Sequence, residues 1–141
     1  MIAYLARAFA AAALFATGTI GHAEDAPKLN LELNAADTVG ESCRLTFLLS
    51  NGLPDDVESL VAETVLFSDQ GGVVLLTLFD FGELPAGRPR VRQFQVPETS
   101  CDRLGQVLVN GFDTCTIGGA ASGTCQDALS LSSRMQIKLE G

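Results

Sequence analysis

The sequence predicts an all-β fold, an antiparallel β-sandwich of seven strands with two disulfide bonds. Three observations support this prediction. Apolar and polar residues alternate along several short segments, as expected for strands with one buried face. Turn-forming residues separate these segments, and the five prolines all fall at predicted strand boundaries or in loops. Four cysteines, an even number, fit a disulfide framework in an exported chain.

Residues 1–23 have the composition of a secretory signal peptide. Arg7 supplies a positive charge, residues 8–20 are apolar, and the small residues Gly21 and Ala23 stand where a signal peptidase reads the chain. The apolar run is shorter than the roughly 20 residues that a membrane-spanning helix needs. We therefore expect cleavage after Ala23, export to the periplasm or the medium, and no membrane span after cleavage.

The mature domain, residues 24–141, lacks the residues of many common sites. The only histidine, His22, and the only tyrosine, Tyr4, precede it, and the chain has no tryptophan. Without histidine, serine–histidine and cysteine–histidine catalysis are excluded, and so are histidine-based zinc and copper centres. The net charge of −8 disfavours nucleic acid and anionic membranes as partners, because phosphate binding needs clustered positive charge.

The seven strands follow one another along this domain. In the first, Leu29, Leu31 and Leu33 alternate with polar residues, and Cys43 begins a second alternating run. The predicted strands are residues 29–34, 43–50, 57–68, 73–81, 90–96, 104–117 and 130–139.

The third and fourth strands have less regular patterns. In the third, β-branched residues favour a strand over a helix, but either alternate set of side chains could face the core. One set includes Val61 and Val65, and the other includes Leu60 and Leu66. Residues 73–81 are apolar on both faces almost throughout, which predicts a central strand or a strand covered by another surface.

Two later segments carry turn or helix signals. Asn110-Gly111 is a strong hairpin signal, so residues 104–117 form either two short paired strands or one long strand with a bulge; we favour the bulge. Residues 124–127 fit a capping-box pattern, which predicts a single helical turn.

The disulfide pairing is predicted from the topology. In an up-and-down arrangement, the start of the second strand and the loop after the fifth strand lie at one end of the sandwich. That end holds Cys43 and Cys101, and the opposite end holds Cys115 and Cys125. Of the three pairings that four cysteines allow, we therefore expect Cys43–Cys101 and Cys115–Cys125. A four-thiolate metal site is disfavoured because the spacing contains no Cys-x-x-Cys pair.

Four motifs resemble a family of small, uncharacterised exported proteins of alphaproteobacteria. They are G-x-S-C-R-L-T-F from Gly40, V-L-F-S-D-Q-G-G from Val65, L-x-D-F-G-x-L-P-A-G-R-P-R-V-R-Q-F from Leu78, and V-L-V-N-G from Val107. The family supplies no activity and no catalytic residues. More loosely, the order of strands and turns is similar to bacterial immunoglobulin-like and fibronectin-type modules. That resemblance implies a seven-stranded immunoglobulin-like sandwich, and such modules are mostly binding or spacer domains.

Arg88, Arg90 and Arg92 recur at every second position around the start of the fifth strand. They could form a cationic stripe for an anionic ligand or partner, because a guanidinium group binds carboxylates and phosphates bidentately. The interpretation that we favour is that they are solvated and protect an edge strand from aggregation. Arg92 shares its parity with Phe94, and an inward arginine would need a carboxylate partner. The candidate partners are Glu63, Asp80 and Glu83.

The sequence predicts a binding function rather than catalysis. Asp55, Asp56 and Glu58 lack the ligand spacing of a calcium loop, which favours solvated acids. We expect a non-enzymatic binding or accessory module of the cell envelope that uses no cofactor or metal and whose partner is another envelope protein. One alternative is a structural or assembly part that pairs strand 73–81 with a partner strand. A further alternative is a hydrolase that uses two carboxylates.

Overall fold

The computed structural model describes Gly21 and residues 25–141, so the predicted signal segment lies outside the described residues apart from Gly21. The strands are β1 (Leu29–Val39), β2 (Ser42–Asn51), β3 (Val57–Ser68), β4 (Val73–Leu84), β5 (Arg90–Val96), β6 (Leu104–Ile117), β7 (Ala120–Ala121), β8 (Leu129–Ser133) and β9 (Lys138–Glu140). The short helices are η1 (Cys101–Arg103) and α1 (Thr124–Asp127).

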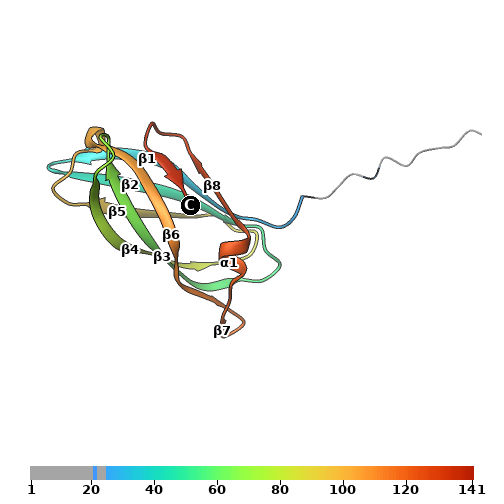
Figure 1. The fold of residues 1–141 in the computed structure, drawn as a ribbon. Coiled ribbons are helices and arrows are strands. Elements are labelled where there is room, and N and C mark those ends of the chain that lie inside the picture. The colour runs from blue at the N-terminus through green and yellow to red at the C-terminus, as the bar shows by residue number, and fades with distance from the viewer. Residues whose placement is uncertain (1–20, 22–24) are drawn as a thin grey trace, which may run out of the picture.

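Two β-sheets form the two layers of the fold. The four-stranded sheet has the order β5-β2-β1-β8, and the five-stranded sheet has the order β4-β3-β6-β7, with β9 also paired to β6. In Figure 1, β3, β4 and β6 lie side by side in one layer, with β1 and β2 behind them. The prediction of an all-β fold with two packed sheets is therefore confirmed.

The predicted number and direction of the strands are wrong. Nine strands form within residues 25–141, and both sheets are mixed, because β8 runs parallel to β1 and β9 runs parallel to β6. The last predicted strand is divided into β8 and β9. Between them the hydroxyl of Ser133 accepts a hydrogen bond from the N–H of Met135 at 3.1 Å and donates one to the carbonyl of Ile137 at 2.6 Å. This turn carries the chain from one sheet to the other.

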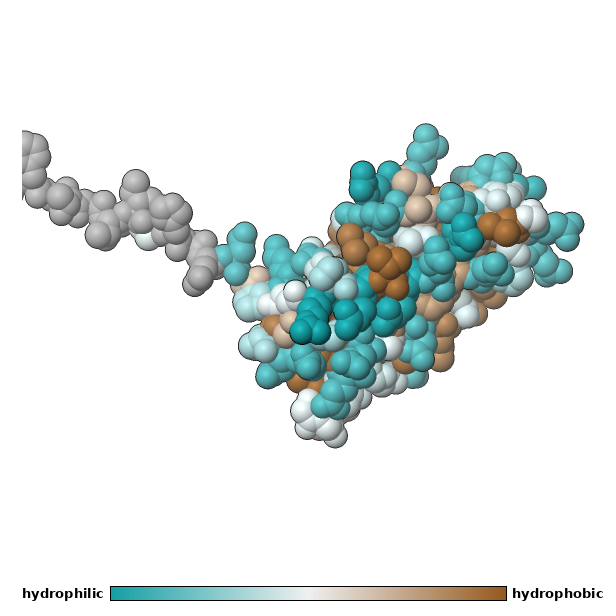
Figure 2. All heavy atoms as spheres, turned by 180° about the vertical axis from the view of Figure 1, so that it is seen from behind, coloured by the Kyte–Doolittle hydropathy of each residue, from teal (hydrophilic) through white to brown (hydrophobic). Residues whose placement is uncertain are grey.

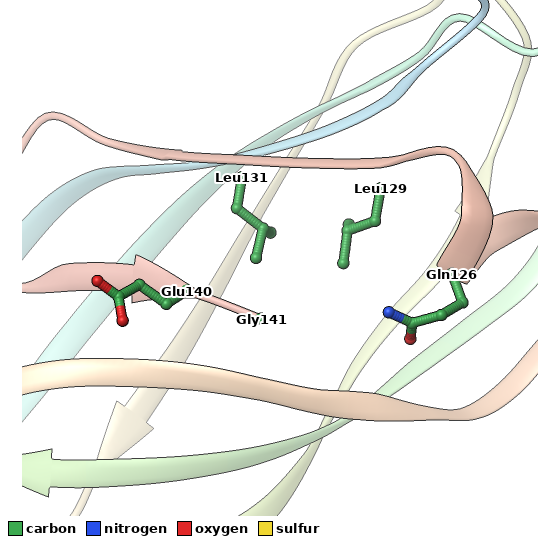
Figure 3. Close-up of a pocket in the computed structure, with 5 residues that line it drawn as sticks. All are labelled: Gln126, Leu129, Leu131, Glu140 and Gly141. Carbon is green, nitrogen blue, oxygen red and sulfur yellow. The ribbon is translucent and has the colours of Figure 1, made fainter.

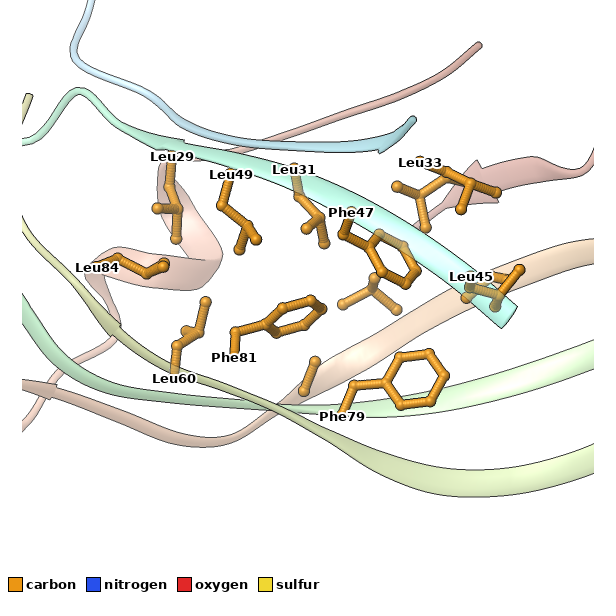
Figure 4. Packing of buried hydrophobic residues seen from close by; sticks show 14 of the residues in the cluster. Leu29, Leu31, Leu33, Leu45, Phe47, Leu49, Leu60, Phe79, Phe81 and Leu84 are labelled. Carbon is orange, nitrogen blue, oxygen red and sulfur yellow. The ribbon is translucent and has the colours of Figure 1, made fainter. Parts of the chain in front are cut away.

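The hydrophobic core fills the space between the sheets. In Figure 4, leucines of β1 and β2 point toward Phe79 and Phe81 of β4. Phe47 is fully buried and makes an edge-to-face contact with Phe81, with ring centroids 5.6 Å apart. Burying one such side chain stabilises the fold by about 1.5–3 kcal/mol.

The structure also resolves the ambiguity in β3. Leu60 and Leu66 have at most 1% of their surface exposed, and Ala62 between them is fully buried. This set therefore faces the core. The opposite face of β3 carries Val61, Glu63 and Val65, and it lies on the outer side of the five-stranded sheet.

Both predicted disulfides are confirmed. Cys43 and Cys101 are bonded with their Cα atoms 4.8 Å apart, and Cys115 and Cys125 are bonded with their Cα atoms 6.2 Å apart. The first joins β2 to η1 and the second joins β6 to α1. The topological argument gave the correct pairing although the strand count was wrong, because the changes in topology all follow Cys115.

The bulge and the helical turn also form. β6 is one continuous strand, and its pairing with β3 skips Asn110 and Asp113. α1 is a single turn, as expected, but the predicted capping box is absent: Gly123 is the N-cap and has no side-chain bond. The N–H of Thr124 instead donates to the hydroxyl of Ser122 at 3.1 Å.

The prediction that residues 73–81 form a central strand is wrong, whereas the alternative of a strand covered by another surface stays a prediction. β4 extends to Leu84 and lies at the edge of the five-stranded sheet, where it pairs only with β3. Its apolar outer residues are exposed to solvent. The sequence pattern of a strand buried on both faces therefore belongs to a strand that has one buried face and one open edge.

Candidate functional site

The described acids form no metal-binding cluster. Within residues 25–141, no three Cys, Asp or Glu side chains are placed to hold a metal ion. Of the acids Asp55, Asp56 and Glu58, two accept hydrogen bonds from turns: Asp56 from the N–H of Ala86 at 2.7 Å, and Glu58 from the N–H of Gly119 at 3.0 Å. These carboxylates hold turns together. Among the described residues, no helix is long and apolar enough to cross a membrane.

The cavities are open and have few ionisable groups. A cavity of about 500 Å³ lies between β8, β9 and α1 and is lined by Gln126, Leu129, Leu131, Glu140 and Gly141. Figure 3 shows both leucines pointing across it toward the β9 segment. Glu140 is its single ionisable side chain among these, and it is bonded to Gln106 at 3.0 Å.

The three arginines do not act as one unit. Arg88 lies before β5 and is exposed, whereas Arg90 and Arg92 are half-buried on the inward side of β5. Arg90 donates to the carbonyl of Pro89 at 3.1 Å. The predicted ion pair of Arg92 is wrong, because its guanidinium group bonds to backbone carbonyls instead of a carboxylate.

Arg92 fastens part of the β4 edge to the opposite sheet. Its Nε donates to the carbonyl of Phe81 at 2.8 Å, and a second nitrogen lies 3.4 Å from the carbonyl of Glu83. Next to this contact, the rings of Phe79 and Phe94 stack with centroids 4.2 Å apart. Hydrogen bonds therefore join the edges of β4 and β5 from Phe81 onward.

The preceding part of the β4 edge has no such protection. From Leu75 to Asp80 the pairing with β3 is regular, and bulges lie only outside this run. Residues 73–79 contain no charge, proline or glycine. Natural edge strands are usually protected by such residues or by bulges, because free N–H and C=O groups invite another strand. This segment of β4 is open to pairing.

The outer face of this segment is apolar and exposed. The exposed fractions are 38% for Val74, 65% for Leu76 and 53% for Leu78. We call these three residues, with the backbone edge from Leu75 to Leu78, the β4 patch. Behind them on β3, Val65 lies opposite Leu76 in the register.

Three other large apolar residues are exposed in the part of the chain that the structure describes. Val73 lies at the start of β4, whereas Val39 at the end of β1 and Val91 on β5 belong to the other sheet. Seen from behind in Figure 2, most of the surface is hydrophilic, and hydrophobic residues gather in small groups. The β4 patch combines exposed apolar side chains with an open strand edge.

The five-stranded sheet has a second partly open edge, on the side of β6 away from β3. β9 pairs with Gln106–Leu108 and β7 with Thr116–Ile117, so the stretch between them has no strand on that side. Two of the three register shifts in the pairing of β6 with β3 fall within this stretch, and such bulges discourage strand addition.

Comparisons with known proteins add a likeness in fold. No family model matches the chain, and no curated protein matches it. The solved structure of IrmA from Escherichia coli is similar, with a TM-score of 0.56 and 11% identity, over 75% of this chain and 92% of that chain. At this identity the likeness shows the fold alone. The resemblance to small exported alphaproteobacterial proteins stays a prediction, and the chain is assigned to no family.

Proposed function

We propose that this protein is a non-enzymatic binding module of the cell envelope, and that it binds another envelope protein by adding a partner strand to the edge of β4. The observation that carries the proposal is the unprotected run of the β4 patch beside a part of the same edge that Arg92 and Phe94 close. In strand addition, main-chain hydrogen bonds provide affinity and alternate side chains provide specificity. The β4 patch supplies free main-chain groups along its edge and exposed apolar side chains at alternate positions.

The proposed location is the periplasm or the medium. The predicted signal peptide supports it, and so do two disulfide bonds, which persist in oxidising compartments and are rare in the cytosol. The proposal also covers the assembly role considered above, because a module that completes a partner's sheet would use the same edge.

Site-specific crosslinking in intact cells tests the proposal. A photo-crosslinking residue placed at position 76 should capture a defined partner in the envelope. The matched control is position 91, because Val91 has a similar exposed fraction of 57% but lies on the other sheet. The captured product should disappear when Leu78→Lys is introduced in the same chain. Equal capture from positions 76 and 91, or none from position 76, would contradict the proposal.

A further inference from the structure

The outer face of β4 changes character along its length. The register places Val65 opposite Leu76, Glu63 opposite Leu78 and Val61 opposite Asp80. A strand added to β4 would present its own outer-face side chains beside Leu76, Leu78 and Asp80, within about 5 Å of the nearest Cβ atoms for directly opposite pairs. Its side chains would therefore lie beside the apolar Leu76 and Leu78 at one end and beside the carboxylate of Asp80 at the other, with Glu63 one strand further away on β3.

The acids at this end form no ion pair within residues 25–141. Glu63 and Asp80 are both exposed. Glu63 accepts a hydrogen bond from the amide of Asn110 at 2.6 Å, and Asp80 accepts one from the N–H of Gly82 at 2.8 Å. Within residues 25–141 the one ion pair is between Arg44 and Asp37, far from this face in the sheet order. The nearby guanidinium group of Arg92 is bonded to carbonyl oxygens. Neither Glu63 nor Asp80 therefore has a salt-bridge partner among the described residues.

We infer that the partner segment is cationic: an extended strand with apolar residues at alternate positions and a lysine or arginine at the level of Asp80. The inference rests on the proposed function and specifies the chemistry of the partner. Opposite charges across neighbouring strands attract, whereas like charges directly opposite destabilise the pair. The net charge of −8 also favours a cationic partner at longer range, because it attracts positively charged chains as they approach.

A second copy of this chain fits the surface less well. Antiparallel pairing of two β4 strands centred on Thr77 would place Leu76 opposite Leu78 of the other copy. The same register would place Asp80 opposite Val74, so neither acid would meet a cation. Two chains of net charge −8 also repel each other at moderate ionic strength. The charges therefore favour a foreign cationic strand over self-pairing.

Three blocked peptides with one alternating threonine–valine centre test this inference. They carry lysine, glutamine or glutamate at both ends, so that an end residue reaches the level of Asp80 in either strand direction. Binding to the mature protein is followed by NMR through the backbone amides of β4. The lysine peptide should bind about two- to fivefold more tightly than the glutamine peptide, and the glutamate peptide should bind most weakly. Asp80→Lys should reverse this order, whereas the control Glu83→Lys, beyond the Arg92 contacts, should keep it.

Other results would overturn the inference in distinct ways. Equal affinity for the three peptides, an unchanged order in Asp80→Lys, or no binding at β4 would each show that the partner is not a cationic strand. A dimer in light scattering that Leu76→Lys dissociates would show that the occupant is a second copy. Failure of the proposed function itself is separate, because crosslinking from position 76 needs no assumption about the partner's charge.

Discussion

The Nε atom of Arg92 on β5 lies 2.8 Å from the carbonyl oxygen of Phe81 on β4 and donates a hydrogen bond to it. This contact connects the edge strands of the two sheets. It occurs where Gly82 has a φ of +67°, beyond the regular run of the β4 edge. The arginine thus occupies a carbonyl that an added strand would otherwise reach, and it marks the end of the open segment.

Removing this arginine should weaken the fold. Hydrogen bonds from a charged donor contribute about 1.5–3 kcal/mol, and partial exposure of Arg92 lowers this figure, so we expect Arg92→Ala to cost about 1–2 kcal/mol. Urea denaturation measures the change. Gln95→Ala is the control, because Gln95 is exposed on the same strand and no side-chain bond involves it. Equal stability of the two variants would mean that the contact contributes nothing.

Two glycines of β6 should respond oppositely to alanine. A Cβ atom at Gly105 would lie 2.8 Å from the carbonyl oxygen of Ser68 and 3.0 Å from the Cα of Asp69, both backbone atoms. Gly105→Ala should therefore destabilise the fold by about 1–3 kcal/mol, as overpacking does. At Gly111 a Cβ would meet nothing within 4 Å, and Gly111→Ala should be neutral or stabilise by up to about 1 kcal/mol. Thermal unfolding of the pair checks this, and a similar loss in both would refute the steric explanation.

Among the described residues, Glu98 is the one non-glycine residue with a positive φ, which is 55°. A left-handed conformation costs an ordinary residue roughly 1–2 kcal/mol. Glycine has no such cost but loses more entropy on folding, so Glu98→Gly should stabilise the domain by about 0.5–1 kcal/mol. Glu98→Ala keeps the strained backbone and removes only the carboxylate, so it should stay near the parent. If alanine stabilises as much as glycine, the backbone is not the cause.

The two disulfides should differ in their contribution. They close loops with sequence separations of 58 and 10 residues. In the chain-entropy model these bonds stabilise by about 4 and about 3 kcal/mol respectively. Replacing Cys43 and Cys101 together by alanine should therefore cost more than replacing Cys115 and Cys125, as measured by the free energy of unfolding. The reverse order would show that local contacts around α1 outweigh loop closure.

The sequence predicted the strands better than their positions in the sheets. Alternation places Leu29, Leu31 and Leu33 correctly, because a buried face imposes period 2 whatever lies beside the strand. The break after β8 was missed, since it depends on hydrogen bonds of one serine, Ser133, rather than on glycine or proline. The parity of Arg92 with Phe94 correctly indicated that the arginine side chain points inward. Its hydrogen-bond partners were missed, because they are backbone carbonyl groups, which leave no signal in the sequence.

The position of β4 was missed for a related physical reason. Apolar residues on both faces usually mean burial on both faces. In β4 the inward residues Phe79 and Phe81 are buried, whereas Leu76 and Leu78 face solvent. Composition does not distinguish a side chain covered by its own fold from one that another chain would cover. The candidate site therefore emerged only when strand order and exposure were known.

The open edge of β4 should make the protein prone to aggregation, and one added charge on this edge should reduce that tendency. An uncharged, regular edge strand promotes aggregation, and a lysine on it opposes sheet-to-sheet pairing. Leu76→Lys should change the free energy of unfolding by less than about 0.5 kcal/mol, because Leu76 is 65% exposed and loses little buried area. It should nevertheless slow aggregation of the concentrated protein, followed by light scattering. Val91→Lys adds the same charge at an exposed valine on the other sheet, so it separates the effect of net charge from that of the edge. Because one added lysine makes the net charge less negative in both variants, slower aggregation in Leu76→Lys alone would locate the aggregating surface at β4. Equal slowing in both would place it elsewhere and would remove the main physical reason to regard this edge as a binding surface.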